Sequence, residues 1–136
     1  MMKTKILAVM ALTASFSGAV HAVGVQYGEY QQVQNIAQCG YIANTMIADN
    51  TAQVMELSLK KYVDITARMR PGGYNPSSSD LATDYALFFQ QSVSDTADDM
   101  FKAINAQGLP LAPESWQAMA AQFWVSNNCA AVTAVK

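Results

Sequence analysis

SDLATDYALFFQQSVSDTADDMFKAINAQG, residues 79 to 108, is the stretch that decides the fold. It keeps one helical period, because its apolar residues recur at spacings of three, four and seven and most share one helix face. These residues are Leu81, Tyr85, Phe88, Phe89, Val93, Met100, Phe101 and Ile104. Ser79 or Asp80 can cap the first turn, and Gly108 can take the left-handed conformation that ends a helix. The sequence therefore predicts one long helix whose wide aromatic face other helices must cover.

The first residues indicate export. Lys3 and Lys5 precede an apolar run over residues 6–16, and Val20-His21-Ala22 has the small residues of a cleavage site. This is the pattern of a secretory signal peptide, and its apolar core is shorter than the roughly 18 residues that a membrane span needs. We therefore expect a cleaved signal peptide over residues 1–22 and a single domain over residues 23–136, periplasmic or secreted and without a membrane span.

The charge of the mature chain limits its partners. Residues 23–136 carry six basic and ten acidic side chains, a formal charge of −4. Nucleic acids and anionic membrane surfaces reward clustered Lys and Arg, so neither is the expected partner. The single histidine, His21, lies in the predicted signal peptide. The mature chain then lacks the commonest general base and metal ligand, and we predict neither catalysis nor a cofactor.

The two cysteines of the chain, Cys39 and Cys129, are expected to pair. Disulfides form by default in exported proteins, and neither cysteine belongs to a Cys-x-x-Cys motif. A bridge between them spans 90 residues. In the chain-entropy model, a loop of that length stabilises a protein by roughly 4–5 kcal/mol.

Three further helices are expected around the long one. One starts near Glu29, the second covers about Thr51–Met69 with Asn50 as its cap, and the last opens at Pro113. Residues 29–69 can also be read as one long bent helix, but two helices fit usual globular lengths better. The tail 130–136 carries too little signal to place. The fold class is therefore all-α: a small antiparallel bundle of about four helices with one disulfide.

An irregular stretch over residues 71–79 interrupts the helices and carries candidate contact residues. Prolines and paired glycines exclude regular structure there, and Tyr74 and Asn75 stand among them in a composition that suits a contact loop. The simpler interpretation is a linker whose tyrosine folds back onto the core. Trp124 is a third candidate for partner contact if it points outward, although core packing is the commoner role of such a residue.

Two patterns suggest chemistry only weakly. Asp95, Asp98 and Asp99 could meet a metal ion on one side of the long helix, but they lack the glycine turn and distal glutamate of a calcium loop. A solvated acidic patch is the favoured interpretation, so no metal site is predicted. Ser58 and Lys61 match the Ser-x-x-Lys spacing of some serine enzymes, without the companion motifs. An exposed helix segment is the favoured interpretation of that pair.

The function predicted from these features is binding. The chain is expected to dock on another envelope or secreted protein, as an inhibitor, an immunity-type protein or an accessory factor. One alternative is a periplasmic stress chaperone that opens as its carboxylates take up protons. Another is a carrier of a small apolar ligand, which requires an internal cavity of roughly 300 Å³.

Overall fold

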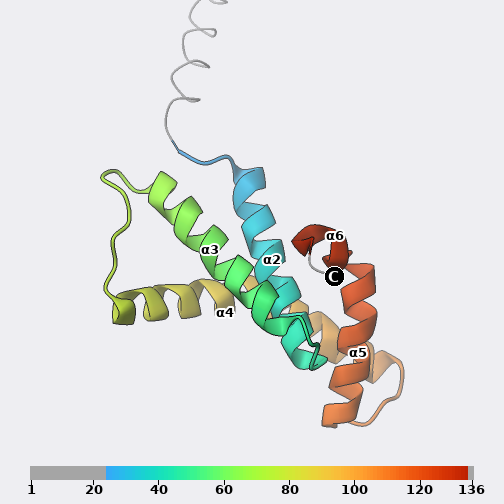
Figure 1. The fold of residues 1–136 in the computed structure, drawn as a ribbon. Helices are drawn as coiled ribbons and strands as arrows, with labels where there is room; N and C mark the ends of the chain where they lie inside the picture. Colours follow the sequence, from blue (N-terminus) through green and yellow to red (C-terminus); the bar gives the residue numbers. More distant parts are fainter. Residues whose placement is uncertain (1–23, 135–136) are drawn as a thin grey trace, which may run out of the picture.

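The structure, a computed structural model, describes residues 24–134 and is all-helical over that range (Figure 1). The predicted signal peptide lies outside the described residues. The helices are α2 (Tyr27–Thr45), α3 (Thr51–Met69), α4 (Ser78–Ala106), α5 (Pro113–Ser126) and α6 (Cys129–Thr133). Residues 29–69 thus form two helices, as preferred. The short α6 is an addition to the four helices expected from the sequence.

Helix α2 is the centre of the fold, because it contacts each of the other four described helices. Small side chains let its neighbours approach closely: Ala37 and Ala43 are fully buried and Gly40 lies between them. A Cβ added at Gly40 would come within 2.7 Å of the Sδ of Met55 on α3. The glycine therefore makes room for a side chain of α3.

Helix α4 departs from the expected antiparallel bundle. Figure 1 shows it running across α2 and α3, whereas α2, α3 and α5 run roughly alongside one another. Its buried stripe recurs every fourth residue and includes polar positions: Phe88, Ser92, Thr96, Met100 and Ile104. The hydroxyl of Ser92 donates to the carbonyl of Phe88 at 2.8 Å, so its burial leaves no unpaired donor. Phe101, expected in the core, is 42% exposed because it lies 100° around the helix from Met100.

The helix starts differ from the predicted caps. Ser77 caps α4, since its Oγ accepts a hydrogen bond from the amide of Asp80 at 3.2 Å; Ser79 and Asp80 were the predicted caps. Asn50 stands at the cap position of α3, but its side chain makes no capping hydrogen bond there. Its backbone ψ of 7° departs from the extended conformation that capping requires.

Three helices end on a residue with positive φ at the same position after the helix. These residues are Ile47 after α2 (φ 56°), Gly108 after α4 (φ 67°) and Asn128 after α5 (φ 54°). Glycine and asparagine are common there, whereas a β-branched residue such as isoleucine is strained. The amide of Ala48 donates to the carbonyl of Ala43 at 2.9 Å, which completes a Schellman motif around Ile47.

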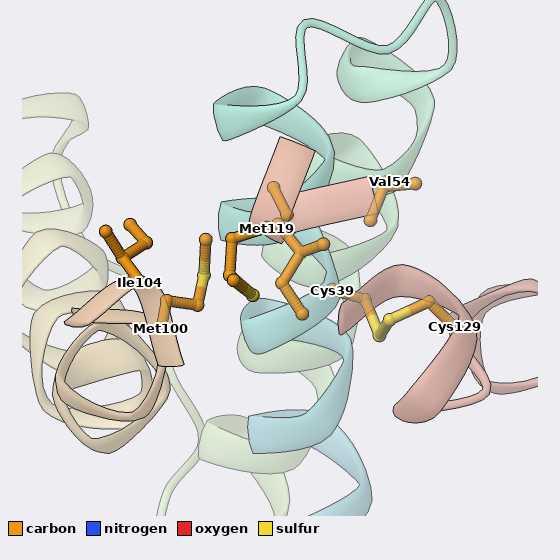
Figure 2. Packing of buried hydrophobic residues seen from close by; sticks show 8 residues of the cluster. Cys39, Val54, Met100, Ile104, Met119 and Cys129 are labelled. Atoms are coloured by element: carbon orange, nitrogen blue, oxygen red, sulfur yellow. A yellow bond between two sulfur atoms is a disulfide. The ribbon is translucent and has the colours of Figure 1, made fainter. Parts of the chain in front are cut away.

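Two apolar clusters occupy opposite halves of the helices. The disulfide-end cluster is built from α2, α3, α4, α5 and α6 around Cys39, Ile42, Val54, Met100, Ile104, Met119, Ala120 and Cys129 (Figure 2). The second cluster joins the start of α2, the end of α3 and the start of α4 through Val33, Ala37, Tyr62, Ile65 and Phe88. Each half of the molecule thus has a core of its own along α2.

The predicted disulfide is confirmed: Cys39 on α2 is bonded to Cys129 at the start of α6, with Cα atoms 5.6 Å apart. Figure 2 shows the two sulfur atoms joined between these helices. Both cysteines are almost fully buried. Among residues 24–134, no helix combines the length and the apolar character that a membrane crossing requires.

Candidate functional site

The stretch 70–77 between α3 and α4, called the Tyr74 loop below, borders a surface pocket. Gly72 and Gly73 have φ of 86° and 87°, and the amide of Gly73 donates to the carbonyl of Arg70 at 3.0 Å. Proline followed by glycine inside such a bond is the sequence of a type II turn. The pocket has a volume of about 290 Å³ and is lined by Arg70, Gly73, Tyr74, Asn75, Pro76, Asp80, Thr83 and Asp84. The loop and the first turns of α4 therefore form one concave surface.

Tyr74 attaches the loop to both α3 and α4. Its hydroxyl donates to a carboxylate oxygen of Asp84 at 2.8 Å, and its ring meets Tyr62 edge to face at 6.3 Å between centroids. The guanidinium of Arg70 lies 4.9 Å from the centre of the Tyr74 ring, within the range of a cation–π contact. Burial of the phenol, followed by its hydrogen bond to Asp84, raises the pKa of Tyr74. The hydroxyl therefore stays a donor at neutral pH.

Beneath the loop lies a group of three rings, Tyr62, Tyr85 and Phe88, called the aromatic cluster below. Tyr62 lies 5.6 Å from Tyr85 and 4.8 Å from Phe88 between ring centroids. The hydroxyl of Tyr85 and the hydroxyl of Ser58 are 2.8 Å apart in a hydrogen bond across α3 and α4. Burial raises the pKa of Tyr85, and the bond to Ser58 opposes that rise. The Tyr74 loop therefore packs against closely packed rings, through the contact between Tyr74 and Tyr62.

The pocket combines charges of both signs. Arg70 supplies a guanidinium, and Asp80 and Asp84 supply carboxylates one helical turn apart on α4. Within residues 24–134, the salt bridges involve Arg68 with Glu29 and with Asp64, so neither pocket aspartate is paired with a described cation. The carboxylate of Asp80 remains available to groups from outside the chain, whereas one oxygen of Asp84 accepts the hydrogen bond from Tyr74.

The sequence-predicted contact residues fall in two places. Tyr74 and Asn75 both line this pocket, whereas Trp124, which lies on α5, packs against the disulfide-end cluster. Tyr74 also folds back onto the core, as the simpler interpretation had it. Arg70, Asp80 and Asp84 were missed as site residues. The acidic patch predicted from the sequence was that of Asp95, Asp98 and Asp99, and nothing in the sequence placed the loop beside Asp80 and Asp84.

The two chemical patterns of the sequence have the following surroundings. Asp95, Asp98 and Asp99 are exposed on α4, and no group of three or more His, Cys, Asp or Glu among the described residues is placed to hold a metal ion. Ser58 is fully buried and engaged by Tyr85, so it does not lie on an exposed helix face as expected. Its hydroxyl has no open side on which a substrate could approach.

A second concave surface follows the groove between α2 and α3. Its volume is about 520 Å³, and it is lined by Glu29, Gln32, Val33, Ile36, Lys61, Asp64, Ile65 and Arg68. Arg68 on α3 forms a salt bridge with Glu29 on α2 across it. Both partners are exposed to solvent, so this salt bridge contributes little to stability.

The comparisons with known proteins add no relative to this geometry: no protein-family model, no curated protein and no solved structure matches the chain.

Proposed function

We propose that this chain is an exported protein-binding module that docks on another envelope or secreted protein, as an inhibitor, an immunity-type protein or an accessory factor. The Tyr74 loop is the proposed contact surface. One observation carries the proposal: Tyr74 and Asn75, both flagged from the sequence, border a pocket together with Arg70. Tyrosine and arginine are among the residue types that dominate binding energy at protein interfaces.

Rigidity of the loop favours this role. Tyr74 is tied to Asp84 by a hydrogen bond of 2.8 Å and packs on Tyr62, so little conformational freedom is left to lose on binding. The disulfide between Cys39 and Cys129 supports an exported location, because such bonds persist in oxidising compartments. The chaperone and the ligand-carrier alternatives remain predictions.

Site-specific photo-crosslinking tests the proposal. Benzoylphenylalanine is placed at Asn75 of the Tyr74 loop, and at Asn105 as a matched control. Both asparagines are exposed, but Asn105 lies at the C-terminal end of α4, at the opposite end of this helix from the loop. After irradiation of intact cells, the cross-linked species are identified by mass spectrometry. We expect one defined envelope protein at position 75 and not at position 105. Identical products at both positions, or none at position 75, would overturn the assignment.

A substitution then measures the contribution of the tyrosine. We expect Tyr74→Ala to weaken binding of the captured partner by about thirtyfold, the cost of removing a hot-spot side chain of about 2 kcal/mol. Ala121→Ser, on an exposed position of α5, should leave the dissociation constant unchanged. Both affinities are measured by calorimetry with the purified partner.

A further inference from the structure

We propose that Tyr74 and Asp84 form an acid-sensitive latch that holds the Tyr74 loop over the aromatic cluster. The latch is a single hydrogen bond of 2.8 Å between the Tyr74 hydroxyl and the Asp84 carboxylate. This inference concerns the fold of the chain and stands whether or not the loop binds a partner. It assigns to the acidic start of α4 a role in controlling access to an apolar surface.

Apart from the contacts of the Tyr74 ring with Tyr62 and Arg70, the loop has few other attachments. It contains no regular secondary structure. The hydrogen bond from the amide of Gly73 to the carbonyl of Arg70 closes a turn within the loop and does not attach the loop to α4. The Tyr74 hydroxyl therefore joins the middle of the loop to α4, ten residues further along the chain. Loops with few buried contacts open locally without unfolding of the whole protein.

Release of the loop exposes an aromatic surface. Tyr74 packs against the second apolar cluster, in which Tyr62 is only 8% exposed and Phe88 only 6%. Tyr62 meets Tyr74 directly, so it is the first ring to be uncovered when the loop swings away. An apolar surface that becomes exposed in acid is the property that the chaperone alternative requires.

Acid acts on the latch through the carboxylate. A hydrogen bond to an ionised acceptor is roughly twice as strong as one to a neutral group, so protonation of Asp84 weakens the bond to Tyr74. The groups that line the pocket with Asp84 are Asp80 and Thr83 on α4 and Tyr74 and Arg70 on the loop, and Tyr62 on α3 contacts the Tyr74 ring. Arg70 keeps its charge in acid, and none of these groups replaces the lost carboxylate as an acceptor of equal strength. The fraction of open loop should rise about tenfold.

Native-state proteolysis measures the open fraction. Chymotrypsin at pH 7.5 and pepsin at pH 3.5 both cleave after tyrosine or phenylalanine, so cleavage after residue 74 reports loop opening in each condition. Rates are divided by those of an unfolded peptide with the same loop sequence. The oxidised protein is compared with Tyr74→Phe and Asp84→Asn, which remove either half of the latch, and with Asp80→Asn, which removes a neighbouring charge outside it.

At pH 7.5 we expect Tyr74→Phe and Asp84→Asn to be cleaved about tenfold faster than the unsubstituted protein, and Asp80→Asn at the unsubstituted rate. At pH 3.5 the differences between the four proteins should shrink, because protonation of Asp84 weakens the bond in the unsubstituted protein and in Asp80→Asn. Tryptophan fluorescence should stay constant throughout, because both tryptophans pack on the disulfide-end cluster. The latch is overturned if Asp84→Asn matches the unsubstituted protein at pH 7.5, if the Tyr74→Phe difference is as large at pH 3.5 as at pH 7.5, or if the tryptophan emission shifts with the cleavage.

Discussion

Replacement of Ile47 by glycine should stabilise this protein, although it removes a large apolar side chain. Ile47 occupies the left-handed position that follows α2, with φ of 56°, and its side chain is 77% exposed. Little buried contact is therefore lost with the side chain. The two hydrogen bonds of the Schellman motif, from Ile47 to Asn44 at 3.2 Å and from Ala48 to Ala43 at 2.9 Å, involve only the backbone and persist in the variant.

The magnitude follows from two opposing effects. A non-glycine residue in the left-handed region costs about 1–2 kcal/mol, and the β-branched side chain of Ile47 places it at the upper end. Removing this strain stabilises the folded state, but glycine offsets about 0.5–1 kcal/mol of the stabilisation, because it loses more conformational freedom on folding. The net expectation is a gain of about 1 kcal/mol in the free energy of unfolding.

Urea unfolding of the oxidised protein, followed by circular dichroism at 222 nm, measures the gain. We expect a higher midpoint for Ile47→Gly with an unchanged slope, because the surface exposed on unfolding stays nearly the same. The matched control is Gly108→Ala, at the equivalent position after α4, where φ is 67° and an added Cβ meets nothing within 4 Å. That variant should lose about 1 kcal/mol. A destabilised Ile47→Gly, or a stabilised Gly108→Ala, would refute the reasoning.

Three further outcomes are expected. Replacement of Cys39 and Cys129 by alanine should lower the free energy of unfolding by roughly 4–5 kcal/mol in urea titrations. Ser58→Ala and Tyr85→Phe should each cost about 1–2 kcal/mol, and the double variant should cost less than their sum, since the two hydroxyls satisfy each other. The raised pKa of Tyr74 and of Tyr85 means that folding disfavours their ionised forms. Stability from this source is complete below pH about 10, the ordinary tyrosine value, and should decline as the pH rises further, which unfolding titrations between pH 8 and 11 will show.

Periodicity was sufficient to predict the long helices, because each buries an apolar stripe that recurs every three or four residues. The break between α2 and α3 was also predictable from Asn50 and Thr51. Burial of Ser92 and Thr96 was not, since serine and threonine are mostly exposed in proteins and the sequence does not show which polar positions of a stripe are covered by other helices. The expectation of export made the disulfide predictable, whereas α6 is too short for a periodic signal.

The candidate site shows a similar division. Tyr74 and Asn75 stood out among turn-forming residues, but Asp80 and Asp84, which lie beside them in the structure, did not stand out as site residues. Their meeting depends on the direction in which the loop leaves α3 and on the angle at which α4 crosses the other helices. Both are set by packing of the aromatic cluster, in which Tyr62 and Tyr85 lie far apart in the sequence. Long-range packing of this kind leaves no local pattern.

The account depends most on a rigid Tyr74 loop, since both the proposed contact surface and the latch require it. Backbone ¹⁵N relaxation of the oxidised protein at pH 7 measures this directly at the amides of Gly73, Tyr74 and Asn75. We predict order parameters close to those of the flanking helices, about 0.85. Values below about 0.6 at these three amides would show a loop that moves freely on the nanosecond timescale, and would contradict the account.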